Sequence, residues 1–500
     1  MRSSFYGFEI AKTGLFASQR AIDLTGHNIA NANTVGYTRQ RLLLSSKELV
    51  AGNERFKEII NGYSGAGVRM DGVDQIRNVF LDTQYRRENS TKEMWSARSD
   101  ALSYIEDIYG ETNNTGLSTA INDFFTSLHT LTMNPESKEY RTNVMQNAMK
   151  MTDAFQHIAQ QLADKQADMN EAARVSVIQV NGLADAIAGL NDQIFRYELT
   201  GQRANDLRDQ RNNLLDELSG IVNYTYQEDA DGMVSVNLGG NLLVDRTTTH
   251  KLQTTATKTN PIDGLGNLLD VTWADYTEAD GSASPLVVTG GRLKAYLDLR
   301  DGDTADNVGI PYMAHRLDTL ASSIASEFNA IHNAGWTYPD ASNGNASATG
   351  VDFFEVPAGG VTAFNFSISA AIKASVYNIA AAGSQIADAT GRGDNTNALA
   401  LVRLQNRLDL PVIGSLEGYL KGYLAEIGVE ASHANKMLDS EQALVDSLVN
   451  QRESVSGVSV DEEMTNLVKF QHSYAASARV ITTIDEYLDL LINKMGIVGR

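Results

Sequence analysis

Apolar residues recur every seven positions at both ends of this 500-residue chain, in segments that contain no proline. No proline precedes Pro135 and none follows Pro411, so helices at either end can run long. A seven-residue spacing places side chains on one face of an α-helix and is typical of helices that pair with other helices. We predict helices over residues 5–31 and 460–495. The seven-spaced residues are Phe8, Leu15, Ile22 and Ile29 at one end, and Leu467, Tyr474, Ile481 and Leu488 at the other.

The flanks of both segments carry signals for where the helices stop and start. The first helix runs into an Asn-rich stretch that ends in Gly36 and Tyr37. Asn and Gly accept left-handed backbone conformations, so this stretch is expected to end the helix. Ser459 or Asp461 can cap the start of the second helix, where acidic side chains suit the helix dipole.

Neither end helix has a covering partner in its own neighbourhood of sequence. Burial of four Leu or Ile side chains contributes roughly 6–12 kcal/mol, whereas ordering 25 residues costs on the order of 25–50 kcal/mol of backbone entropy. Helix hydrogen bonds recover only part of that cost, because isolated helices are marginal in water. We therefore expect the two ends to pair with each other, to be frayed in the free subunit, and to become ordered on assembly.

The middle of the chain alternates between helical and β-rich composition. Alternating stretches such as residues 233–238, with Gly and Asp-Gly turns nearby, indicate strands. The predicted fold is mainly α, with long coiled-coil-like terminal helices, a helical body and outward-facing β inserts. The predicted domains are a terminal helical assembly domain (residues 1–60 with 456–500), a helical body (residues 61–220 with 290–335 and 393–455), and β-rich inserts at residues 221–289 and 336–392.

Charge and composition exclude several classes of function. The formal net charge is −21, which disfavours nucleic acid and anionic membranes as partners because both attract basic faces. The chain has no cysteine, which removes disulfides, thiolate nucleophiles and Cys-ligated metals. No apolar stretch reaches the ~18 residues of a membrane span, so no membrane insertion is expected. The first residues do not resemble a cleaved secretory signal, which leaves the cytosol or an export route without cleavage.

No catalytic constellation is visible. The eight histidines include no pair at metal-ligand spacing on a helix, and the common nucleotide-binding and hydrolase motifs are missing. Residues 229–232, Asp-Ala-Asp-Gly, are better explained by a hairpin turn than by a calcium loop. We expect no catalytic, cofactor or metal site. An enzyme hidden in a β insert is the alternative from a different functional class.

Motifs at both ends resemble one known family. The stretch Asn28-Ile29-Ala30-Asn31-Ala32-Asn33-Thr34, followed by Gly36-Tyr37-Thr38-Arg39-Gln40, is similar to the amino-terminal signature of bacterial flagellar rod, hook and hook-associated proteins. The stretch Ser456 to Glu463, followed by Leu467, Phe470-Gln471 and Tyr474, resembles the other end of the same family. Internal matches to its hook-associated members are Asp206 to Arg211, Gly290 to Leu293, Leu299 to Asp301, Phe328 to His332 and Gly393 to Thr396.

The resemblance implies a structural subunit at the junction between the flagellar hook and filament, outside the cell. It implies export by the flagellar type III route and self-association in a ring. Its implied neighbours are the hook protein, hook-associated protein 3 and a cytoplasmic export chaperone. The expected assembly interface consists of the seven-spaced residues together with Asn31, Asn33, Gly36 and Tyr37. The alternative is another axial subunit, such as the hook protein or hook-associated protein 3.

Overall fold

The computed structural model describes residues 5–47, 65–109, 116–262, 266–279, 281–340, 346–387, 391–490 and 492. These fall into two compact units. Unit 1 comprises Met1–Asn89, Val180–Lys251 and Gln442–Arg500, and unit 2 comprises Ser90–Gln179 and Leu252–Glu441. Within the described ranges, no helix combines the length and the apolar character that crossing a bilayer requires.

Unit 1 contains both end helices. Its helices are α1 (Phe5–Ala30), the start of α2 (Val79–Tyr109), the end of α4 (Lys138–Glu198), α5 (Asn205–Ile221), the end of α10 (Leu416–Ser456) and α11 (Val460–Asp489). Its strands are β1 (Gln40–Ser46), β2 (Val68–Gln75), β3 (Thr225–Glu228), β4 (Val234–Leu238), β5 (Asn241–Asp245) and β6 (Thr248–Thr249). Strands β1 and β2 form an antiparallel hairpin, and β3 to β6 form a four-stranded antiparallel sheet in sequence order.

Unit 2 is built mainly from helices around an apolar core. Besides its share of α2, α4 and α10, it contains α3 (Leu117–Met133), α6 (Arg292–Asp301), α7 (Ile310–Ala334), α8 (Ala370–Ala374), the short 3-10 helix η4 (Val376–Asn378) and α9 (Thr396–Leu404). Its strands are β7 (Leu252–Lys258), β8 (Leu268–Thr277), β9 (Ala283–Pro285), β10 (Asp303–Thr304) and β11 (Asn307–Val308). Strands β7, β8 and β9 form one antiparallel sheet, and β10 pairs with β11.

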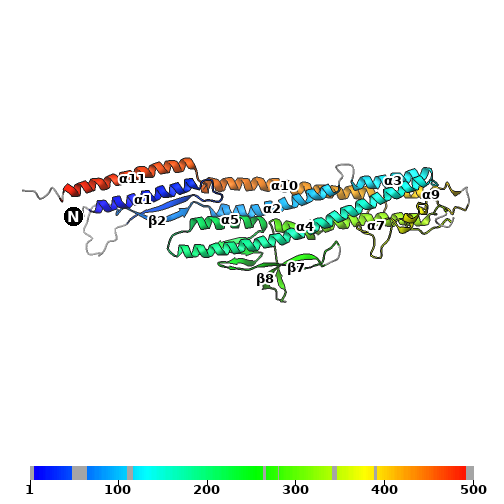
Figure 1. Ribbon diagram of the computed structural model, residues 1–500, viewed down its shortest axis with the longest axis horizontal. Helices are drawn as coiled ribbons and strands as arrows, with labels where there is room; N and C mark the ends of the chain where they lie inside the picture. The colour runs from blue at the N-terminus through cyan, green and yellow to red at the C-terminus, as the bar shows by residue number, and fades with distance from the viewer. Residues whose placement is uncertain are drawn as a thin grey trace, which may run out of the picture. The chain divides into compact units, whose positions relative to one another are not determined.

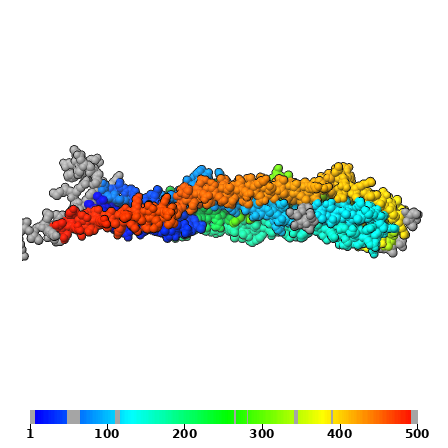
Figure 2. Space-filling model, turned by 90° about the horizontal axis from the view of Figure 1, so that it is seen from above, coloured from blue at the N-terminus to red at the C-terminus, as the bar shows by residue number. Residues whose placement is uncertain are grey.

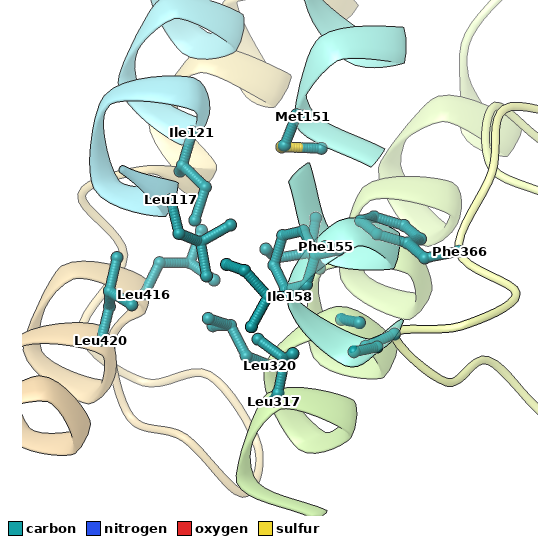
Figure 3. Close-up of a cluster of buried hydrophobic side chains, with 14 of the residues drawn as sticks. Leu117, Ile121, Met151, Phe155, Ile158, Leu317, Leu320, Phe366, Leu416 and Leu420 are labelled. Carbon is teal, nitrogen blue, oxygen red and sulfur yellow. The ribbon is translucent and has the colours of Figure 1, made fainter. Parts of the chain in front are cut away.

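Large side chains from several helices and a loop meet in the core of unit 2. Figure 3 shows the cluster, in which side chains of α3, α4, α7 and α10 converge with Phe366 of the loop before α8. Phe124, Phe328, Phe353 and Phe354 are fully buried, with ring centroids 4.8–6.0 Å apart in tilted or edge-on contacts. Such pairs add to the burial of apolar area, so this core is well suited to hold unit 2 together.

The first β-rich range has the predicted character, and its turn is a hairpin. Strands β3 to β9 all lie within residues 221–289. Between β3 and β4, the Oδ1 atom of Asp229 accepts hydrogen bonds from the backbone N–H groups of Asp231 and Met233, and Gly232 has φ +78°. A carboxylate that accepts from its own turn is an Asx-type motif, which agrees with the hairpin interpretation.

The second range, predicted to be β-rich over residues 336–392, differs from that expectation. Its described residues contain isolated bridges, helix α8 and η4, and no sheet strand. Side chains of neighbouring helices form hydrogen bonds with the backbone groups of this range, in place of the bonds that a β-sheet would provide. Asn329 binds the backbone of Phe353 and Phe354, and His332 accepts from Ala380 N at 2.8 Å while its Nδ1 lies 2.6 Å from Val351 O. The aromatic side chains of Phe353, Phe354 and Phe366 in this range are buried in the core of unit 2.

Candidate assembly interface

Helices α1 and α11 pack against each other in antiparallel orientation (Figure 1). A Cβ atom placed on Gly7 would lie 3.4 Å from the Cδ1 atom of Ile484, and one placed on Gly14 would lie 3.2 Å from the Oγ atom of Ser477. Farther along, Asn28 Nδ2 donates to Glu463 Oε2 at 3.0 Å. Figure 2 shows the red atoms of α11 lying along the blue atoms of α1. The predicted pairing of the two ends is therefore confirmed.

The line of closest approach on α1 is made of small side chains. Its residues follow the alternating four- and three-residue spacing of a coiled-coil seam. They are Gly7, Ala11, Gly14, Ser18, Ala21, Thr25 and Asn28, of which the last four and Ala11 are buried. The seven-spaced residues Phe8, Leu15, Ile22 and Ile29 each stand one position after a seam residue and are only half-buried. They flank the seam rather than fill it.

The β1–β2 hairpin covers one side of α1. Thr13 Oγ1 accepts from the backbone N–H of Val68 at 3.2 Å, and a Cβ on Gly67 would lie 3.3 Å from the Cα of Ile10. An apolar hollow of about 460 Å³ lies here, lined by Ile10, Ala11, Val68 and Val480 among others. Residues two positions apart on a helix point about 200° apart. Phe8 and Leu15 therefore face away from the hairpin, on the open side of the pair.

Helix α11 is poorly covered by the rest of unit 1. Among its described residues, Glu463 is the only one that is fully buried. Leu467, Ile481 and Leu488 are half-buried, and Tyr474 is 38% exposed. Three further apolar side chains, Val460, Met464 and Val468, are 46–48% exposed. The helix thus keeps apolar area in solvent that a single chain does not bury.

A polar cluster closes the base of the helix pair, where α1 ends and α11 begins. The Asn28 amide donates to Gln40 O and to Glu463 Oε2, both at 3.0 Å. Its Oδ1 atom accepts from Gln40 N at 3.1 Å and from the Tyr37 hydroxyl at 2.7 Å. Every polar group of this buried amide is thereby satisfied, as burial of a polar side chain requires.

Arg39 joins this cluster to α11. Its guanidinium contacts Glu463 Oε1 through Nε at 2.9 Å and through Nη2 at 2.7 Å, and it donates to Glu462 Oε2 at 2.9 Å. The backbone N–H of Arg39 donates to Ser456 O at 2.9 Å. Ser459 caps α11 by accepting from Glu462 N, which confirms one of the two predicted caps. We call Asn28, Arg39 and Glu463 the base lock.

The start of α5 holds the same segment from the other side. Asp209 accepts from Thr38 N at 3.0 Å and from Thr38 Oγ1 at 2.6 Å, and Gln40 Nε2 donates to Asp206 Oδ1 at 2.8 Å. Burial raises the pKa of Asp209 to about 6, although the bonds from Thr38 and the charge of Arg77 oppose the rise. Burial and the nearby carboxylates of Asp206, Asp209 and Glu463 also raise the pKa of Tyr37.

A chain of alternating charges extends from Asp209 through unit 1. Arg77 lies 3.6 Å from Asp209 and 2.6 Å from Asp82. Arg452 of α10 contacts Asp82 at 3.0 Å and Asp216 at 2.8 Å, and Arg86 contacts Asp216 at 2.6 Å. The side chains are largely buried, and removing one partner of a buried pair leaves the other uncompensated. The network therefore fixes the segment around Thr38 against α2, α5 and α10.

The remaining predicted interface residues lie in the turn after α1. Gly36 has φ +76°, and a Cβ there would overlap the Asn213 side chain, so this position requires glycine. Asn31 stabilises the turn by donating to His27 O at 3.0 Å and accepting from Thr34 Oγ1 at 3.2 Å. Asn33 is exposed. These residues shape the turn, whereas the side chains that connect the two termini are Asn28, Arg39 and Glu463.

The base lock was not among the predicted site residues. Its members come from segments more than 400 positions apart, so no local pattern brings them together. All three nevertheless lie inside the terminal motifs quoted above. A polar residue at a seam position of a helix is the sequence signal that could have indicated them. Among the described residues, no group of three or more His, Asp or Glu is placed to hold a metal ion.

Comparison with family models matches three parts of the chain. Residues 102–354 match the flagellar hook-associated protein FlgK helical domain. Residues 8–38 match the flagella basal body rod protein model, and residues 449–494 match the C-terminal model of the flagellar basal body rod FlgEFG proteins. The two rod models thus cover most of α1 with its turn and all of α11, and the larger model covers much of unit 2.

Comparison with individual proteins gives full-length relatives. Flagellar hook-associated protein 1 of Bacillus subtilis is 33% identical over all of both chains. The protein of the same name from Escherichia coli is 27% identical, over 97% of this chain and 98% of its own. A solved structure titled as the flagellar hook junction protein FlgK from Burkholderia pseudomallei shares the fold, with a TM-score of 0.61 over 75% of this chain, all of that chain and 18% identity. The chain therefore belongs to the flagellar hook-associated protein 1 family, a family of structural components of the bacterial flagellum.

Proposed function

We propose that this chain is a non-catalytic subunit that connects the flagellar hook to the filament by polymerising through its terminal helix pair. The observation that carries the proposal is the open side of the pair. Phe8, Leu15 and Ile22 of α1 face away from the hairpin, and elsewhere on the pair α11 leaves Met464 and Val468 about half exposed. Exposed apolar area of this kind marks a protein–protein contact.

The energetics of α11 favour the same proposal. Helices in water gain most of their stability from packing of an apolar face. In α11 the apolar residues are at most half-buried, and the one fully buried side chain among those described is a carboxylate. Burial of apolar area contributes roughly 25 cal/mol per Å². Neighbouring subunits that cover the open side would supply the stabilisation that the free chain lacks.

The proposed partners follow from the family and from the matches at the ends. Models of rod proteins match both termini, so the terminal pair belongs to a part that axial proteins of the flagellum have in common. We assign it contacts with further copies in a ring, with the hook protein and with hook-associated protein 3. An export chaperone would cover α11 before assembly, and type III export would deliver the chain to the outside of the cell. In this proposal residues 1–60 and 456–500 assemble, and the helical body and inserts do not.

Replacing Leu467 and Ile481 together by Asp tests the proposal. Both residues are half-buried on α11, and two charges there would oppose helix–helix contact. We expect unit 2 to unfold at an unchanged denaturant concentration, while cells that carry the variant grow hooks without filaments under electron microscopy. The matched control is Ser473→Asp with Thr483→Asp, at two exposed positions of the same helix. Normal filaments in the Leu467 and Ile481 variant would refute the assignment of the interface.

A further inference from the structure

The small side chains of the α1 seam do little to fix the register, that is, the alignment of α11 along α1. The α1 side presents Gly7, Ala11, Gly14, Ser18 and Ala21 at coiled-coil spacing, and none of these side chains is larger than the hydroxymethyl group of serine. A slide of α11 by seven residues along α1 exchanges one small side chain for another. Packing therefore loses little in a slipped state, and weakly specified registers are prone to slippage.

One layer of the seam breaks this uniformity. Glu463 is 3% exposed and Asn28 is 2% exposed, and they are hydrogen-bonded to each other across the helix pair. Glu463 also receives two contacts from Arg39, which is held by its own backbone bond to Ser456. A slide by seven residues would place Glu463 beside Ala21, with its carboxylate away from both donors. A buried charge without partners is strongly disfavoured.

We propose that the base lock of Asn28, Arg39 and Glu463 is the device that sets the register of the terminal helix pair. A single buried polar residue in a coiled-coil seam is known to select one alignment over others at some cost in stability. The lock therefore decides which residues of α11 share the open side with Phe8, Leu15 and Ile22. Because α1 and α11 pair within one chain, this role of the base lock is independent of polymerisation.

Cysteine cross-linking measures the register directly, because the chain contains no native cysteine. Gly14→Cys with Ser477→Cys reports the native register, in which a Cβ at residue 14 lies 3.2 Å from Ser477 Oγ. Gly7→Cys with Ser477→Cys reports a slip of one heptad. In dilute full-length protein we expect oxidation to join the first pair and not the second. Cβ atoms of a disulfide lie roughly 3.5–4.5 Å apart, and neighbouring turns lie outside that range.

Glu463→Leu is introduced into both reporters, with Glu462→Leu as the matched control. Glu462 is exposed and touches the same arginine, so the control removes a carboxylate without altering the seam. We expect Glu463→Leu to raise the cross-linking yield of the slipped reporter at least tenfold, and Glu462→Leu to leave it unchanged. Glu463→Gln, which keeps a hydrogen-bonding group, should give an intermediate yield.

Two results would overturn the proposal. If the Glu463→Leu chain still cross-links only through the native reporter, the small-residue seam sets the register without the lock. If it cross-links through neither reporter, Glu463 holds the pair together rather than choosing its alignment. Comparison of the cross-linking yields with the motility of cells that carry the same variants distinguishes an effect on register from an effect on assembly.

Discussion

The terminal helix pair of unit 1 and the core of unit 2 are both helical, yet opposite kinds of residue hold them together. In unit 2, large aromatic and aliphatic side chains are fully buried, and Phe124, Phe328, Phe353 and Phe354 touch one another. In the terminal pair the buried positions are small or polar, and bulky side chains such as Phe8 and Leu15 are only half-buried.

This difference indicates that the two regions depend on different partners. A core of packed rings is complete within one chain and needs nothing from outside. A seam of small residues with a polar base gives alignment but little apolar burial. The first region is suited to stand alone, and in the proposed assembly neighbouring subunits complete the second. Three experiments test this contrast between the terminal helix pair and the core of unit 2.

Limited proteolysis of the dilute monomer should give the largest effect. We expect cleavage to trim about 30–60 residues from each end on the order of 100-fold faster than it cuts α7, because sparsely packed elements open with low free energy. Fragment masses over time measure the contrast. If both ends resist the protease as well as α7 does, the free subunit already has a self-contained terminal pair, and the contrast fails.

Removal of a ring from the core of unit 2 comes next. Phe328→Ala should lower the free energy of unfolding of unit 2 by about 3–5 kcal/mol, since it opens a cavity among three other buried rings. Denaturant unfolding followed by circular dichroism measures the loss. Tyr487→Ala removes a ring that is 63% exposed on α11, and its cost should stay within about 0.5 kcal/mol. Equal losses from both variants would erase the distinction between the regions.

The smallest effect concerns the polar base and pH. The folded-state pKa of Asp209 is about 6, whereas an unfolded Asp titrates near pH ~3.9, so the folded state binds the proton more tightly. Stability from this group should therefore increase by about 1 kcal/mol as the pH falls from ~7 to ~5. Hydrogen exchange of the amides in α5 measures it.

Asp209→Asn, which cannot titrate, is the control for that experiment. Its α5 amides should lack the increase between the two pH values. If the unmodified chain shows a decrease instead, the bonds from Thr38 and the charge of Arg77 outweigh the burial of the Asp209 carboxyl. In that case the charged form of Asp209 stabilises the polar cluster at the base of the helix pair.

Much of the helical framework was predictable from the sequence. The first helix was predicted over residues 5–31 and is observed over Phe5–Ala30, and the second begins at Val460 behind the predicted Ser459 cap. Of the range predicted up to residue 495, residues 491 and 493–495 lie outside the described part of the chain. Strong periodicity, missing prolines and a capping residue are local signals, which is why they succeed.

The features that depend on distant contacts were not predictable. The β1–β2 hairpin was not predicted: β1 falls in the predicted terminal helical domain and β2 in the predicted helical body. Helix α3 lies inside the body predicted over residues 61–220, but no helix-start signal gives its bounds. The seam on α1 was not predicted because Gly and Ala give a weak hydrophobic signal, whereas the bulkier residues beside them give a strong one. The base lock requires that residues 28, 39 and 463 meet, which depends on the antiparallel pairing itself.

The one-position offset on α1 gives the helix two surfaces that can change separately. Substitutions at Gly14 or Ala21 alter the packing of α1 against α11. In the proposed assembly, substitutions at Leu15 or Ile22 alter the contact with neighbouring subunits. A lineage can therefore remodel its choice of neighbour without disturbing its internal alignment. In the proposed assembly, the same helix pair can in this way serve subunits that occupy different positions along one axis.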